Sequence, residues 1–281
     1  MRFLLLMLSL ALSASDAIAS GAGKLLATGG LTSIDGAAGG GLVPWAVIGG
    51  HADEGEWDAS AALSYVDTGD FDLQAAAVAV GWSDRLELSA ARLSLGLNAL
   101  MRTREQDQVR LDADVVGAKV RLAGDLIYGE WPQIAAGVQW RRSRDRGLVA
   151  LAGADDDQGV DVYVAASRLW LDGIAGRRTL ANLTVRSTAA NQLGLLGFAA
   201  TRTLTLEGSL AVFLNRSVAI GAEYRSKPDE LAFAPEDPWM DLFVAWFPNK
   251  HWHFTLAYVD LGSVGGVSDQ RGYYLSIQGS P

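Results

Sequence analysis

Apolar and polar residues alternate along most of this chain. Between residues 252 and 259, Trp252, Phe254, Leu256 and Tyr258 alternate with His253, Thr255 and Ala257. The same period of two recurs from residue 57 onward in runs of about ten residues, with turn-forming residues between the runs. This period is typical of strands whose two faces meet different surroundings, so the pattern predicts an all-β protein.

Thirteen strands follow from this alternation. They cover 44–50, 57–66, 71–82, 86–95, 109–123, 132–143, 159–171, 178–188, 203–214, 218–226, 239–247, 252–260 and 271–279. Because a bacterial barrel prefers an even number of strands, residues 24–32 are a candidate for the fourteenth. The alternative is that Lys24–Gly41 folds inside the barrel and one of the weaker strands does not form, which gives twelve.

The alternation alone does not decide which face of the strands is buried. A soluble sandwich buries its apolar row, whereas an outer-membrane barrel turns that row toward lipid. Tight turns at 83–85, 215–216 and 248–250 alternate with longer polar connections at 96–108, 144–158, 189–202, 227–237 and 261–270. Outer-membrane barrels have this arrangement, with short periplasmic turns and long external loops.

The aromatic residues of the apolar row gather in two belts. Tryptophans lie beside the tight turns, and mostly tyrosines lie beside the long connections. The girdle residues are Trp57, Trp82, Trp246 and Trp252 in the first belt, and Tyr65, Trp140, Tyr224, Tyr258 and Tyr273 in the second. Such belts are typical of the two interfaces of a bilayer. We therefore predict a single antiparallel transmembrane β-barrel of the outer-membrane type, with about 12–14 strands.

The first residues are typical of a secretory signal peptide. Arg2 supplies a positive charge, Phe3–Leu12 is a short apolar core, and Ala17-Ile18-Ala19 fits a cleavage site. We expect residues 1–19 to be removed and residues 20–281 to form the barrel domain in the outer membrane. No later run reaches the ~18 apolar residues that a transmembrane helix requires.

Composition removes several classes of function. The net charge of −9 is opposite in sign to that of a nucleic-acid binder. With no cysteine there is no disulfide and no thiolate chemistry, and only His51, His251 and His253 could serve as imidazole ligands or bases. No third ligand accompanies the pair His251 and His253, and no serine has the G-x-S-x-G context of a nucleophile. We expect no metal, no cofactor and no enzyme activity.

The polar row of the strands carries charges of both signs. The candidates for the lumen face are Lys119, Arg121, Arg141, Arg186 and Arg225, together with Asp58, Glu87, Asp161, Glu207, Glu223 and Asp241. Because buried charges are costly unless paired, one interpretation is a network that braces a narrow lumen. The other is a polar conduit whose charges select solutes.

Two segments break the alternation. Gly36–Gly41 is rich in glycine but lacks the Lys-Ser/Thr of a phosphate-binding loop, which favours a tight bend or a segment packed inside the barrel. The connection 191–198 is unusually apolar. It could fold inward as a plug, contact lipopolysaccharide or a hydrophobic solute, or belong to the wall.

Several short runs together resemble a proteobacterial family catalogued as domain of unknown function 3034. They are Gly23–Gly30, Ile34–Gly41, Pro44–Gly50, Asn191–Phe198, Gly221–Arg225 and Trp246–Lys250. The resemblance covers nearly all of the mature chain. It implies an exported outer-membrane protein, and it implies no activity and no catalytic residues.

Three functional hypotheses remain from the sequence. The first is a passive channel or transporter for small solutes, the second is a structural or interaction barrel of the envelope, and the third is a membrane-embedded lipid hydrolase. The expected partners are outer-membrane lipid and lipopolysaccharide, the barrel-assembly machinery and a small solute, with no nucleic acid. The oligomeric state stays open.

Overall fold

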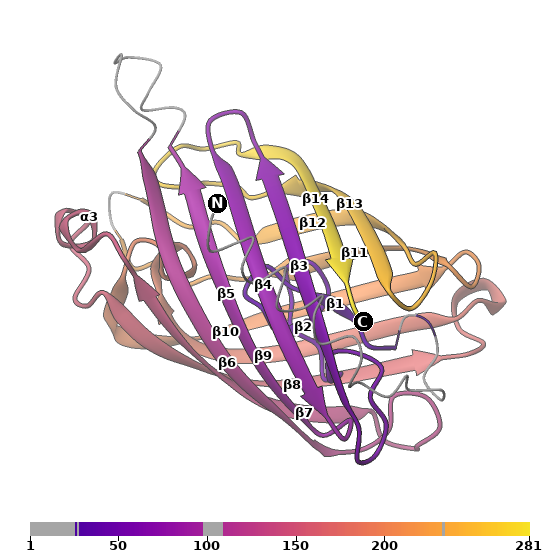
Figure 1. The fold of residues 1–281 in the computed structure, drawn as a ribbon. Coiled ribbons are helices and arrows are strands. Elements are labelled where there is room, and N and C mark those ends of the chain that lie inside the picture. The colour runs from indigo at the N-terminus through magenta and orange to yellow at the C-terminus, as the bar shows by residue number, and fades with distance from the viewer. Residues whose placement is uncertain (1–25, 27, 98–108, 232–233) are drawn as a thin grey trace.

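The computed structural model describes residues 26, 28–97, 109–231 and 234–281. In this part of the chain, twelve antiparallel strands close into one barrel (Figure 1). The strands are β3 (Trp57–Asp67), β4 (Asp72–Trp82), β5 (Leu86–Gly96), β6 (Arg110–Ala123), β7 (Gln133–Ser143), β8 (Gln158–Trp170), β9 (Thr179–Ala190), β10 (Phe198–Phe213), β11 (Val218–Arg225), β12 (Trp239–Trp246), β13 (Trp252–Asp260) and β14 (Arg271–Gly279). Closure leaves no open sheet edge.

Every strand of the barrel pairs with the strands next to it in sequence. The ring closes between β14 and β3, where Ser276 lies opposite Ser64. Tight turns are possible where the chain has residues that accept a left-handed backbone. At 83–84, Ser83 and Asp84 have φ values of 55° and 49°, and short polar side chains tolerate this region better than most.

The predicted barrel is confirmed, and the strand count is the twelve of the alternative. The predicted strand at 44–50 is wrong, because these residues lie inside the barrel rather than in its wall. β10 begins at Phe198 rather than at residue 203, and its pairing with β9 is irregular between Phe198 and Thr203.

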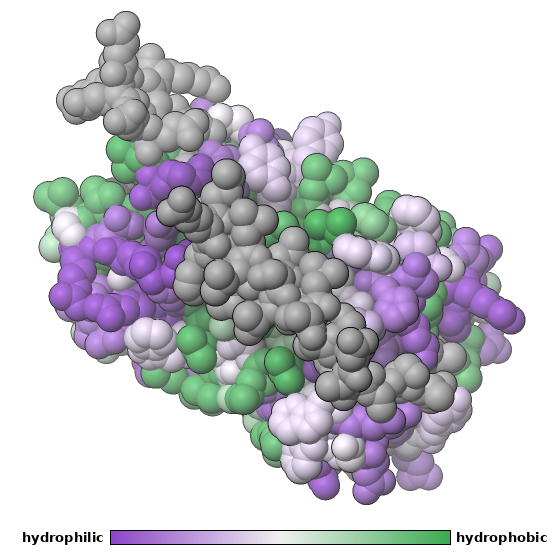
Figure 2. Space-filling model, in the orientation of Figure 1, coloured by the Kyte–Doolittle hydropathy of each residue, from purple (hydrophilic) through white to green (hydrophobic). Residues whose placement is uncertain are grey.

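The apolar row of the strands faces outward. In β12, buried Trp239, Asp241, Phe243 and Ala245 alternate with exposed Met240, Leu242, Val244 and Trp246. Figure 2 shows apolar side chains on the outer wall, with hydrophilic residues gathered mainly toward its two ends. A wall that exposes its apolar row is suited to lipid rather than to water.

The two ends of the barrel differ. One end carries the tight turns and the short helix η1 (Ile174–Gly176), and the other carries α3 (Arg146–Leu151) and η2 (Asn191–Gly194). The turn at 68–71 shows that the connections at this second end are not all long. None of the described helices is long and apolar enough to cross a membrane. The expected signal peptide, residues 1–19, lies outside the described residues and stays a prediction.

Candidate functional site

The lumen of the barrel is filled by the N-terminal segment. All residues from Gly29 to Ala52 are buried, and the indigo ribbon of this segment lies inside the ring of strands in Figure 1. We call residues 28–52 the plug. Its only regular structure is the pair β1 (Leu31–Thr32) and β2 (Ala38–Gly39), so most of its backbone groups must find partners elsewhere.

Carboxylates of the wall accept hydrogen bonds from the plug backbone. Glu87 of β5 accepts from the N–H groups of Ala38 and Gly49, at 3.0 and 2.8 Å. Glu223 of β11 accepts from Leu42 N–H at 2.7 Å. A hydrogen bond to a charged group contributes about 1.5–3 kcal/mol, so these few contacts hold the plug firmly.

The side-chain bonds between wall and plug also include donors to plug carbonyls. Lys119 of β6 donates to the carbonyl oxygen of Ala38 at 2.8 Å and forms an ion pair with Glu87 at 3.1 Å. Glu87 therefore binds the N–H group and Lys119 the carbonyl group of the same plug residue, Ala38. Both are almost completely buried, and each neutralises the other.

Glycine lets the plug backbone approach the wall closely. A Cβ atom at Gly40 would lie 1.9 Å from Oε1 of Glu223. No side chain fits there without displacing the carboxylate that holds Leu42. The glycine at this position is therefore explained by close packing inside the barrel, which is one of the two interpretations that the sequence offered for Gly36–Gly41.

Five neighbouring strands contribute one charge each to a ladder on the lumen face. Its members, in strand order from β7 to β11, are Arg141, Asp161, Arg186, Glu207 and Arg225. Arg141 Nε lies 2.8 Å from Asp161 Oδ2, and Arg186 Nη2 lies 3.3 Å from Glu207 Oε2. The ladder has three guanidinium groups and two carboxylates.

Asp35 of the plug supplies the third carboxylate. Its Oδ2 lies 2.7 Å from Arg141 Nη2 and 3.2 Å from Arg225 Nη1, and Ser33 Oγ donates to its Oδ1 at 2.7 Å. Burial opposes the charge, but Arg225, Arg141 and Arg186 outweigh it and hold the pKa of Asp35 well below its usual range. The carboxylate is therefore charged at neutral pH.

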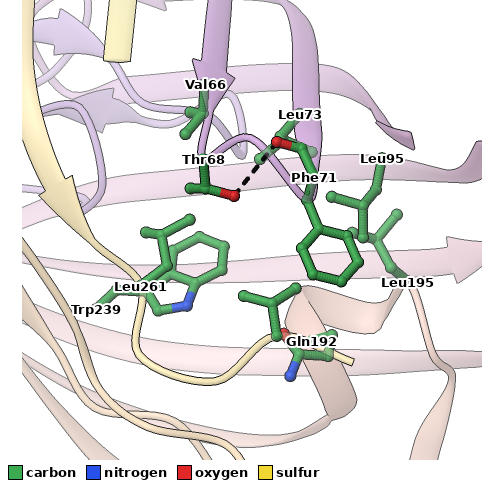
Figure 3. Close-up of a pocket in the computed structure, with 10 residues that line it drawn as sticks. Val66, Thr68, Phe71, Leu73, Leu95, Gln192, Leu195, Trp239 and Leu261 are labelled. Atoms are coloured by element: carbon green, nitrogen blue, oxygen red, sulfur yellow. Dashed lines mark hydrogen bonds between the residues drawn. The ribbon is translucent and has the colours of Figure 1, made fainter. Parts of the chain in front are cut away.

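The loop end of the lumen has a cover of its own. η2 turns inward, and Gln192 N–H donates to Glu236 Oε1 at 2.6 Å, while Glu236 pairs with Lys227 at 3.2 Å. Burial raises the pKa of Glu236 and lowers that of Lys227. Figure 3 shows apolar side chains from several strands and connections, among them Phe71, Trp239 and Leu261, converging near Gln192. Three interpretations were open for residues 191–198. For η2 the structure agrees with the inward-folding one, because all four of its residues are buried.

Most of the lumen candidates named from the sequence lie buried on the inner face. They are Lys119, Arg141, Arg186, Arg225, Asp58, Glu87, Asp161, Glu207, Glu223 and Asp241. Arg121 differs, because it lies at the end of β6, is partly exposed, and pairs with Asp84 and Asp125 of the turn-side connections. Its parity in the strand is correct, but the position lies so close to the turn-side end of β6 that its side chain pairs with the connections there.

The girdle residues all lie on the outer face. Trp57, Tyr65, Trp82, Trp140, Tyr224, Trp246, Trp252, Tyr258 and Tyr273 are exposed. Within one belt, Trp57 and Trp82 are neighbours with ring centroids 5.8 Å apart, and in the other Tyr258 and Tyr273 are 5.9 Å apart. Adjacent strands thus place aromatic rings at matching heights on the wall.

The histidines form no catalytic or metal arrangement in the described part of the chain. His253 is buried with its ring 6.2 Å from that of His51, whereas His251 is exposed in a turn. No group of three or more His, Cys, Asp or Glu residues there could hold a metal. Among the described residues, no serine hydroxyl hydrogen-bonds a histidine ring.

Fold and lumen together define the class: a closed barrel of the outer-membrane type, with an internal plug. The family model described as "Protein of unknown function (DUF3034)" matches residues 28–278, and the chain belongs to this family. That match includes both plug and wall. A search of the curated proteins gave no match.

Solved structures with a similar fold include two porins and a further outer-membrane protein. The KdgM porin is 12% identical, with a TM-score of 0.50 over 78% of this chain and 98% of its own. The NanC porin is also 12% identical, with a TM-score of 0.47 over 78% and 97%. Omp33 of Acinetobacter baumannii is 9% identical, with a TM-score of 0.43 over 81% and 97%. At such identities the likeness to KdgM concerns the fold.

Proposed function

We propose that this protein is an outer-membrane channel for small solutes that its own N-terminal segment holds closed. The observation that carries the proposal is the plug, bound to the lumen wall by side chains rather than by strand pairing. Side-chain contacts can be exchanged without unravelling the barrel, whereas a lumen packed by wall residues alone could not open.

The surroundings of the channel follow from its outer surface. The exposed apolar row and the two aromatic belts suit outer-membrane lipid, with lipopolysaccharide around the loop end. Export by a cleaved signal peptide and insertion by the barrel-assembly machinery complete the proposal. As a channel, the protein carries no catalytic residues.

Single-channel recording of Glu87→Ala in a planar bilayer tests the proposal. This change removes the acceptor of two plug N–H groups and the ion-pair partner of Lys119, and it replaces none of the backbone groups that pair β5 with its neighbours. Since about 1.4 kcal/mol is a factor of ten, we expect the open probability to rise roughly tenfold or more above that of the unmodified chain. Asp114→Ala, which removes a carboxylate that pairs with Arg92 and Arg144, is the matched control and should change nothing.

If the Glu87→Ala barrel folds and its open probability is no higher than that of the unmodified chain, the proposed channel function is wrong. The envelope barrel without transport would then take its place, because a lumen filled from Gly29 to Ala52 fits that function equally well.

A further inference from the structure

The ladder of charges on the lumen wall is incomplete without the plug. Its three guanidinium groups face two wall carboxylates, so the wall alone carries one surplus positive charge in this region. The alternation over an odd number of strands, with arginine at both ends, produces this surplus. An unpaired buried charge is costly, so the wall requires one more anion here.

The neighbouring charges do not supply that anion. Lys119 and Glu87 form one pair, and Lys227 and Glu236 form another, so both are neutral as units. Glu223 accepts from Leu42 N–H and from the hydroxyl of Ser209, and among the described residues neither Glu223 nor Asp241 forms an ion pair with the three guanidinium groups. In the described part of the chain, Asp35 is the carboxylate outside the wall that pairs with these guanidinium groups.

The site has the geometry of carboxylate recognition. Arg141 and Arg225 approach the same oxygen of Asp35 from β7 and β11, and Arg186 Nη2 lies 3.8 Å from it. All three arginines are held by other acceptors. Gln139 Oε1 accepts from Arg141 and Arg186, and Glu207 Oε1 of the wall lies 3.6 Å from Arg225 Nε. The guanidinium groups are thus oriented in advance, which is what tight binding of a carboxylate requires.

We propose that Arg141, Arg186 and Arg225 form a carboxylate-binding site of the lumen wall, occupied in the closed state by the plug's own Asp35. The natural ligand is a small solute that carries a carboxylate. Resting on the proposed channel function, the inference adds that such a solute takes the place of Asp35 when the plug moves. The plug then acts as a built-in competitor for the site that its departure exposes.

Chemical rescue of Asp35→Ala tests the site without any recording. The change leaves the surplus charge and a space of the size of a carboxylate, which formate fills. We expect the thermal midpoint of the folded barrel in detergent to rise by about 2–4 °C when about 0.1 M formate replaces chloride at constant ionic strength. The unmodified chain should not respond, because Asp35 occupies its site.

Two controls make the readout specific. Asp35→Ala combined with Arg225→Gln balances two guanidinium groups against two carboxylates and should lose the response to formate. Formamide, of similar size but uncharged, should not rescue either protein. If Asp35→Ala does not refold in chloride, the refolding yield becomes the readout, and recovery in formate but not in chloride would support the site.

The site is overturned if Asp35→Ala gains nothing from formate over chloride, or if the double variant gains as much. Because this measurement needs no ion flow, its failure would leave the Glu87→Ala recording untouched. A silent Glu87→Ala channel with a clear formate rescue would keep the site and remove only its role in transport.

Discussion

The wall and the plug satisfy their backbones in different ways. Wall strands pair with one another, and each strand turns one face toward the outside and the other toward the lumen. The plug has two short strands and several turn hydrogen bonds of its own, and wall side chains such as Glu87, Lys119 and Glu223 bind its other N–H and C=O groups. Apart from the closure between β14 and β3, the wall forms by pairing of strands that are neighbours in sequence, whereas the contacts of the plug require the wall. Under the proposed function, the plug is the part that moves.

The largest effect is expected from breaking a buried ion pair between wall and plug. Lys119→Met leaves Glu87 charged and unpaired in the lumen, which should lower the free energy of unfolding by about 3–5 kcal/mol in urea titrations followed by tryptophan fluorescence. Arg92→Met breaks an exposed pair on the wall and should cost about 0–1 kcal/mol. Equal losses would mean that the lumen pair is as solvated as the surface pair.

A charge on the outer face should come next in size. Leu242 is 66% exposed in the middle of β12, so Leu242→Arg should cost about 2–4 kcal/mol in lipid vesicles. Leu151 on α3 is 84% exposed outside the wall, and Leu151→Arg should cost almost nothing. Two equally tolerated arginines would contradict a lipid-facing apolar row.

Overpacking of the plug should have a smaller effect. Gly40→Ala forces the new methyl group into Glu223 and should cost about 1–3 kcal/mol, with the strand content unchanged by circular dichroism. Gly147→Ala, where nothing lies within 4 Å of the added atom, is the control and should be neutral or slightly stabilising. A neutral Gly40→Ala would show that the plug does not press against the wall.

Protonation of Asp35 at low pH should have the smallest effect on stability. The folded pKa of Asp35 lies below its ordinary value of 3.8, so its contribution to stability is complete above that value and is lost as the pH falls below it. The difference in thermal midpoint between the unmodified chain and Asp35→Asn should be the same at about pH 7 and about pH 5, and smaller at about pH 3. A difference that already shrinks by about pH 5 would argue against the arginine cluster around Asp35.

The wall could be predicted from the sequence because its period is local. In β12 the residues exposed on the outer face, from Met240 to Trp246, alternate strictly with residues buried on the inner face. The segment 44–50 looked like a strand because its apolar residues also suit a fully buried position, and pattern alone does not separate the two. The glycine-rich run Gly36–Gly41 beside it was the signal that favoured a segment packed inside the barrel.

The lumen site could be predicted only in part. The wall arginines and acids stand in the inward row, so their face could be inferred from parity. Parity does not say how far a position lies from the end of the barrel, and Arg121, near the turn-side end of β6, pairs with Asp84 and Asp125. Asp35 could not be found in this way. It lies in a segment without a period, and its arginine partners are more than 100 residues away in the chain.

The most direct test of the plug is a reversible covalent lock. The chain has no cysteine, and the hydroxyl oxygens of Thr32 in the plug and Ser60 in β3 lie 3.1 Å apart. In the Glu87→Ala background, Thr32→Cys with Ser60→Cys should abolish channel openings on oxidation and restore them on reduction. Ser64→Cys with Ser276→Cys, from two wall hydroxyls 2.9 Å apart, should leave the openings unchanged. An oxidised Thr32–Ser60 lock that conducts as freely as the reduced protein would contradict a plug that must move.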